Sequence, residues 1–190
     1  LLRRAAFGAS RDEIEAKAAQ GYDNVVAELL NPGSQPGVEE DLMLRYNQSF
    51  RESNQARDQQ WVYRMINDKH QLREKMALFW HQVFATGNSK VDNCDQMLEQ
   101  LVMFRKFGMG SYREMLVELS KNPAMLFWLD NNENHRDAVN ENWGRELLEL
   151  FSMGVSNYTE VDVREASRAF TGWNIEPRLP RQPYWRFPWK

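Results

Sequence analysis

The chain has 190 residues, a formal net charge of −3 and 42% hydrophobic residues, which fits one folded domain, or one domain with part of another. Its Lys and Arg are mixed among Asp and Glu, so it lacks the broad basic surface typical of nucleic-acid-binding proteins. No run approaches the roughly eighteen consecutive apolar residues of a membrane-spanning helix, so no membrane span is expected. The single Cys94 excludes an internal disulfide.

Both ends of the chain look cut. The sequence begins with LLRRAAFG, already inside an apolar and basic helical pattern, and it stops at YWRFPWK without a turn or a tail. We therefore expect it to be part of a longer protein.

Two short helices are predicted at the start. Ser10 and Glu13 have the spacing of a capping box, in which the two residues satisfy each other's backbone N–H groups. Gly21 is placed to end that helix, and the pattern resumes in YDNVVAELL until the NPG sequence at residues 31–33 interrupts it. Residues 38–70 then carry long helical stretches with a polar middle.

The middle of the chain has the strongest helical pattern. QLREKMALFWHQVFAT, residues 71–86, places its large apolar side chains along one stripe, and Gly87 is expected to end it. Residues 92–107 are predicted to form the next helix. Two more helices should begin at Ser111, which forms a second S-x-x-E box, and at Asn122, whose following proline suits the first helical position.

Two further helices follow a polar segment. The run from Asn142 to Met153 is expected to be helical and to end at Gly154. Its predicted apolar face consists of Trp143, Leu147, Leu150 and Phe151. Thr159 is a predicted N-cap for EVDVREASRAF, which has acids in its first turn and Arg168 near its end, as the helix dipole favours.

No stretch alternates in the manner of a β-strand, so the predicted fold is all-α. We expect a multi-helix, orthogonal or bundle-like domain over residues 1–173. From 174 to 190 the chain changes character, because four prolines prevent a helix and the Trp, Tyr and Phe side chains need cover. This segment should form an extended Pro- and Trp-rich strap, or begin a missing C-terminal part.

The most polar segment is DNNENHRDAVNE, residues 130–141. Its third, fifth and twelfth residues are Asn132, Asn134 and Glu141, which match side-chain ligand positions of an EF-hand calcium loop. The sixth position, where that loop needs Gly, is His135. Two interpretations stay open: a structural cation-binding loop, or a turn whose Asn and Asp side chains bond to nearby backbone and cap the next helix.

The following helix carries a charged face. Glu141 and Arg145 are four residues apart in the favourable order, and Arg145 could also reach Glu149. Glu146 lies on the adjoining face. If Arg145 faced inward among carboxylates, it would indicate a binding or catalytic role; if it faced outward, it would belong to an ordinary solvated surface.

His81 lies beside the apolar stripe of its helix. As a general base or metal ligand it would need carboxylate partners from other helices. The candidate catalytic residues are His81, Arg145 and Glu146. The candidate ligands for a divalent cation are Asp130, Glu141, Glu149 and Asp162. Together they would suit a metal-assisted hydrolase; the alternative is that His81 is a hydrogen-bonded core residue.

Several strings carry a family resemblance. They are LLRRAAFGAS, LREKMALFWHQVFAT, NPAMLFWLDN, NENWGRELLELFSMG and YTEVDVREASRAFTGW. In this order they resemble a bacterial family catalogued as domain of unknown function 1800. Its signature positions correspond here to residues that include His81, Asp130, Arg145, Glu146 and Tyr158. Where family members commonly have a loop richer in Gly, this chain has NENHRDAV, which counts against the calcium interpretation.

The resemblance implies the amino-terminal portion of a longer helical protein without an assigned activity. Such proteins often carry export signals and tend to be encoded beside a sulfatase-like exported protein, itself uncharacterised. We therefore expect an uncharacterised, periplasmic or extracellular helical protein that acts with this sulfatase-like partner.

Overall fold

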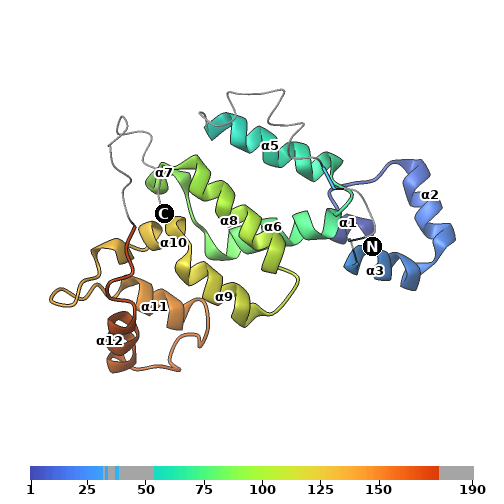
Figure 1. The fold of residues 1–190 in the computed structure, drawn as a ribbon. Helices are drawn as coiled ribbons and strands as arrows, with labels where there is room; N and C mark the ends of the chain where they lie inside the picture. The colour runs from blue at the N-terminus through green and yellow to red at the C-terminus, as the bar shows by residue number, and fades with distance from the viewer. Residues whose placement is uncertain (32, 34–36, 39–53, 176–190) are drawn as a thin grey trace.

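The described part of the chain, residues 1–31, 33, 37–38 and 54–175 of a computed structural model, consists of eleven α-helices and their connections (Figure 1). The helices are α1 (Leu2–Ala5), α2 (Arg11–Gln20), α3 (Tyr22–Leu30), α5 (Asn54–Asn67), α6 (Gln71–Phe84), α7 (Asn88–Val91), α8 (Cys94–Phe107), α9 (Tyr112–Lys121), α10 (Pro123–Trp128), α11 (Asn142–Glu149) and α12 (Glu160–Ala169). A 3-10 turn, η3 (Asn131–Glu133), precedes α11. These residues contain no strand, so the predicted all-α fold is confirmed.

Four predicted helix starts are confirmed by their caps. The capping residues are Ser10, Ser111, Asn122 and Thr159. In each case the side-chain oxygen accepts a hydrogen bond from the backbone N–H three residues further along, a donor that the first helical turn leaves unpaired. In α2 and α12 the third helical residue returns the bond, which completes a capping box. These starts were predictable because both partners are local.

The prediction that Gly87 ends α6 is wrong. The helix stops at Phe84, and Ala85 adopts a left-handed conformation with φ 45°. Gly87 instead precedes the short helix α7, which the sequence pattern did not predict. A Cβ atom on Gly87 would lie 2.9 Å from the Trp128 ring, so the glycine permits close packing against α10.

The helix predicted to reach Met153 ends four residues earlier, at Glu149. The chain then turns through wider hydrogen bonds, in which the N–H groups of both Met153 and Gly154 donate to the carbonyl of Leu148. Gly154, at φ 80°, still closes this turn. Leu150, the first residue after the helix, was predicted to lie on its apolar face but is 64% exposed.

The apolar core lies among α6, α8, α9, α10 and α11. Its buried large side chains are Phe84, Leu101, Phe104, Met115, Leu119, Met125, Trp143 and Phe151. Phe84 is central: its ring stacks on Phe104 with centroids 5.7 Å apart and meets Phe151 edge-on at 5.0 Å. This core holds α11 against the helices of the middle of the chain.

A second, polar interface lies along an adjoining stripe of α6. Glu74 has no exposed surface and accepts a 2.7 Å hydrogen bond from Arg105 Nε on α8. Six residues earlier, just before α6, buried Asp68 pairs with Arg73 at 3.4 Å and with Arg64 of α5 at 3.8 Å. Buried charges need such partners, so ion pairs link α5 to the start of α6 through Asp68 and link α6 to α8 through Glu74.

The N-terminal helices α1 to α3 lie at one end of the molecule, and α11 and α12 lie at the other (Figure 1). Residues 1–173 were predicted to be one helical domain, and helices occupy its described parts up to residue 169. Of the predicted strap at 174–190, all but the first two residues lie outside the described residues. None of the helices in the described ranges combines the length and the apolar character needed to cross a membrane.

Candidate functional site

His81 lies on α6 at the junction with α5 and α8. Its ring meets the Trp61 ring of α5 edge-on, with centroids 5.3 Å apart. Both rings line a cavity of about 110 Å³. Burial lowers the pKa of His81, because the charged imidazolium loses hydration there. His81 is therefore in its neutral form at neutral pH.

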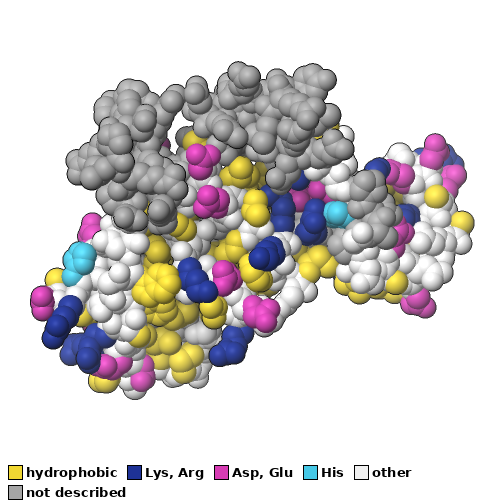
Figure 2. Space-filling view, in the orientation of Figure 1, with side chains coloured by type: hydrophobic (Ala, Val, Ile, Leu, Met, Phe, Trp, Pro, Cys, Tyr) yellow, Lys and Arg dark blue, Asp and Glu magenta, His cyan; other side chains and the backbone are white. Residues whose placement is uncertain are grey.

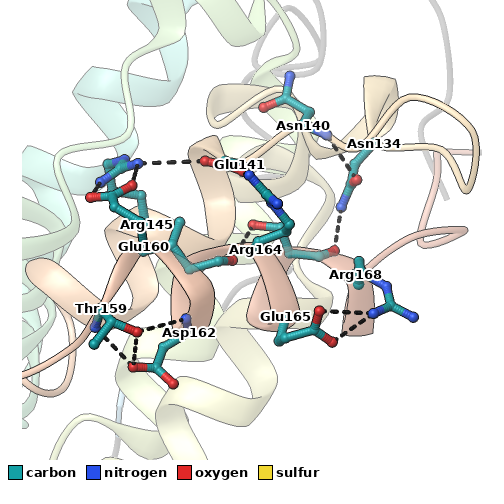
Figure 3. A network of polar contacts seen from close by, with 12 residues as sticks. Asn134, Asn140, Glu141, Arg145, Thr159, Glu160, Asp162, Arg164, Glu165 and Arg168 are labelled. Carbon is teal, nitrogen blue, oxygen red and sulfur yellow. Dashed lines mark hydrogen bonds and ion pairs between the residues drawn. The ribbon is translucent and has the colours of Figure 1, made fainter.

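Arg145 lies on α11 and faces α12. Its guanidinium holds Glu160 through two hydrogen bonds, of 2.6 and 3.0 Å, and also reaches Glu141 at 3.5 Å (Figure 3). These carboxylates, led by Glu160, raise the pKa of Arg145 further above its ordinary value. The Arg145 side chain is 35% exposed, so it lies at the surface and is ringed by acids rather than buried. The predicted pairing with Glu141 is present, whereas Glu149 bonds elsewhere.

Glu146 and Glu149 form the acidic part of the same surface. Burial, and then the neighbouring charge of Glu149, raises the pKa of Glu146. Glu149 accepts a short hydrogen bond from the Tyr158 hydroxyl, and this bond raises the pKa of Tyr158. The loop between α11 and α12 therefore closes over the end of α11 through a tyrosine–carboxylate contact.

A close backbone crossing holds α11 against α12. Gly144 of α11 is buried, and a Cβ atom there would lie 2.8 Å from the Ser167 nitrogen and 3.0 Å from the Val163 carbonyl. Since both are backbone atoms, only glycine fits without a shift of one helix. This crossing positions Arg145 opposite Glu160.

Asp162, a predicted metal ligand, is a helix cap. Its carboxylate accepts hydrogen bonds from the Thr159 N–H and hydroxyl, each 2.8 Å long (Figure 3). These bonds lower the pKa of Asp162. The carboxylate is exposed and serves the first turn of α12.

The 130–141 segment is tied together by side-chain amides. Asn134 is buried; its amide nitrogen donates to the Ser167 carbonyl at 2.8 Å, and its oxygen accepts from the Asn140 N–H at 3.0 Å (Figure 3). Buried Asn131 donates to the carbonyls of Phe170 and Trp173. The segment therefore joins the start of α11 to the end of α12, in keeping with the turn interpretation.

The oxygens proposed as cation ligands have protein partners in this arrangement. Asp130 forms an ion pair with Lys90 at 2.6 Å, and Glu141 forms ion pairs with Arg145 and Arg164. Within the described ranges, no three His, Cys, Asp or Glu side chains come together as a metal-binding group. The four candidate ligands thus take part in separate interactions and do not form a common coordination shell.

The structure brings some of the predicted site residues together and leaves others apart. Arg145 and Glu146 share α11 with Glu149, and together with the first turn of α12 they form one charged surface in which acids predominate. His81 contacts α5 and lines a cavity with α8 residues, and none of its described interactions involves α11 or α12. The geometry does not assemble His81, Arg145 and Glu146 into one catalytic constellation.

Two features escaped the sequence analysis. Trp61 and Asn88 join His81 at its cavity, although they come from separate helices. Large apolar side chains are also exposed beside the acidic surface: Leu150 (64%), Met153 (48%), Val155 (67%) and Val161 (68%). Leu150, Met153 and Val155 lie in the run LELFSMGV, residues 148–155, but their exposure could not be predicted without knowing where α11 ends.

Comparison with known proteins gives one positive result. A family model described as "Protein of unknown function (DUF1800)" matches residues 1–187. No curated protein and no solved structure matches the chain. Since the family match covers nearly the whole sequence, the chain belongs to the DUF1800 family of proteins of unknown function.

Proposed function

We propose that this chain is a protein-interaction domain that binds a partner protein through the α11–α12 surface. This surface is defined by the exposed apolar residues Leu150, Met153, Val155 and Val161 and by the charged side chains of α11 and α12. The observation that carries the proposal is the exposure of these four large apolar side chains within twelve consecutive residues, 150–161. Exposed apolar patches rimmed by polar residues are typical of protein interfaces.

In Figure 2, hydrophobic side chains gather beside α11 and over the loop that leads to α12, with charged side chains around them. The structure of the rim supports specific recognition, because Arg145 is paired with Glu160 and Tyr158 is hydrogen-bonded to Glu149, which lowers the cost of ordering these side chains on binding.

The charge of the rim favours a partner with basic side chains. Residues 141–169 contain six Asp or Glu and three Arg, and no Lys. Complementary charge steers association and selects partners, while the apolar centre supplies most of the affinity. The partner we propose is the sulfatase-like exported protein that the family resemblance implies, in the periplasm or outside the cell.

The test uses the full-length protein and the sulfatase-like protein encoded beside it, both purified, with binding measured by titration calorimetry. Leu150→Asp combined with Val161→Asp should weaken binding at least tenfold, since a charge would be desolvated at each apolar contact. Val102→Asp, at an exposed apolar site on α8 (46%), is the control and should leave the affinity unchanged. Equal affinities for the patch variant and the control would rule out this surface as the interface.

A further inference from the structure

A partly open cavity at the junction of α5, α6, α7 and α8 is separate from the α11–α12 surface. Its volume is about 110 Å³, enough for several water molecules or a ligand of a few heavy atoms. The lining residues are Asp58, Trp61, His81, Asn88, Cys94, Met97, Leu98 and Leu101. The four helices that contribute them lie together in Figure 1.

Three polar atoms of the lining residues are buried without a hydrogen-bond partner in the described part of the chain: Trp61 Nε1, His81 Nδ1 and Asn88 Oδ1. Buried polar groups in folded proteins are nearly always paired, because an unpaired group loses its hydration without compensation. A molecule in the cavity that donates hydrogen bonds can complete those of Asn88 Oδ1 and His81 Nδ1, whereas the Trp61 N–H can only donate and needs an acceptor such as water.

The lining specifies the chemistry of that molecule. Asn88 Oδ1 is an acceptor, and the neutral imidazole of His81 accepts at Nδ1 when its proton is on Nε2. Asp58 adds a carboxylate, and it is the one Asp, Glu, Lys or Arg side chain among the lining residues of the described chain. The acceptors and the negative charge therefore favour a ligand that donates hydrogen bonds and carries positive charge.

The rest of the lining suits an apolar tail. Met97, Leu98 and Leu101 form an aliphatic wall on α8, and the Trp61 ring offers a surface that attracts cations. A carboxylate or phosphate ligand would meet Asp58 without a compensating Lys or Arg in this lining.

We propose that the cavity beside His81 binds a small primary amine, held as its ammonium ion by Asp58, Asn88 and His81 with a short alkyl tail against α8. This site is independent of the partner-binding surface, so either proposal can fail without the other.

The experiment compares three probes of the same length, n-butylamine, 1-butanol and butyrate, by ¹H–¹⁵N NMR of the full chain at pH 7.5. The indole N–H signal of Trp61, assigned by its loss in Trp61→Phe, reports on the cavity, and the other six tryptophans are internal controls. Butylamine should shift the Trp61 signal saturably, with a Kd about tenfold lower than that of butyrate. 1-Butanol should bind with intermediate affinity.

Two variants separate the parts of the site. Asp58→Asn, at an exposed position, should reduce butylamine affinity to that of butanol, while Leu98→Trp should fill the cavity and remove binding of all three probes. Gln82→Ala, on the exposed side of α6, is the control and should bind as the unmodified chain does. Butyrate binding as tightly as butylamine would overturn the proposal. The proposal would also be overturned if the Trp61 signal responded to none of the probes, because the cavity would then hold only water.

Discussion

Along one stripe of α6, Phe84 stacks against the Phe104 ring and meets the Phe151 ring edge-on. Along the adjoining stripe, Glu74 forms an ion pair with α8, and His81 lines the cavity between α5 and α8. The first region is apolar and close-packed. In the second, several buried polar atoms have no hydrogen-bond partner among the described residues, including one oxygen of Glu74 and one nitrogen of Arg105. Apolar contacts are tolerant of small shifts, whereas polar contacts demand one geometry. The comparison indicates that stability depends mainly on the first region and ligand selectivity on the second.

The largest expected effect comes from a cavity in the apolar region. Phe104 is fully buried, so Phe104→Ala should lower the free energy of unfolding by about 3–5 kcal/mol. Urea denaturation followed by circular dichroism measures this change. Val102→Ala, at an exposed position on the same helix, is the control and should change the unfolding free energy by less than about 0.5 kcal/mol. Similar losses for both variants would mean that the stacked rings do not dominate stability.

A smaller effect should come from the polar region, and its sign should depend on which residues are changed. Glu74→Met alone leaves the Arg105 guanidinium, whose side chain is 9% exposed, without its carboxylate and should cost about 3 kcal/mol. Adding Arg105→Met removes the unpaired charge and should restore most of this loss, since apolar replacements of a buried pair are often neutral. Urea titrations of both single variants and the double variant form the required cycle. If the double variant were as unstable as Glu74→Met, the polar region would contribute to the free energy of unfolding as the apolar region does.

The smallest effect is a change in pH dependence at His81. Its pKa is lowered by burial, so the unfolded chain binds the proton more readily than the folded chain. The contribution of His81 to stability is therefore fully present above pH 6.5, its ordinary pKa, and is lost as the pH falls toward the lowered value. His81→Gln should flatten the fall in melting temperature between about pH 6.5 and pH 5. The control is His135→Gln, at an exposed position. If the two variants had the same pH profile, His81 would not be desolvated.

The sequence predicted the fold class and the caps because their determinants are local. Ser10 and Thr159 each bond to a backbone N–H three residues away, and such spacing can be read directly. The end of α11 was misplaced because its last turn follows wide hydrogen bonds to Leu148 that no local pattern marks. The exposure of Leu150 was also missed, because helical spacing alone does not show which apolar positions a neighbouring helix covers.

The candidate site was harder to predict because its contacts join distant parts of the chain. His81 meets Trp61 from α5, and Asp162 was proposed as a metal ligand although its spacing from Thr159 is also that of a capping box. A carboxylate in a sequence can cap a helix, pair with Arg or bind a metal, and only the positions of its neighbours distinguish these roles. Arg145 and Glu141 were correctly paired because they share one helix face.

The amide contacts of Asn131 and Asn134 have a mechanical consequence. Asn134 holds the Ser167 carbonyl and accepts from the Gly172 N–H, while Asn131 holds the carbonyls of Phe170 and Trp173. A pull on the chain beyond residue 173 would load these bonds together before it could unwind α12. The tension would pass through the asparagines into α10 and the apolar core. Residues 170–173 are thus tied to the segment that leads from α10 to α11, so that α12 is bypassed by part of the load.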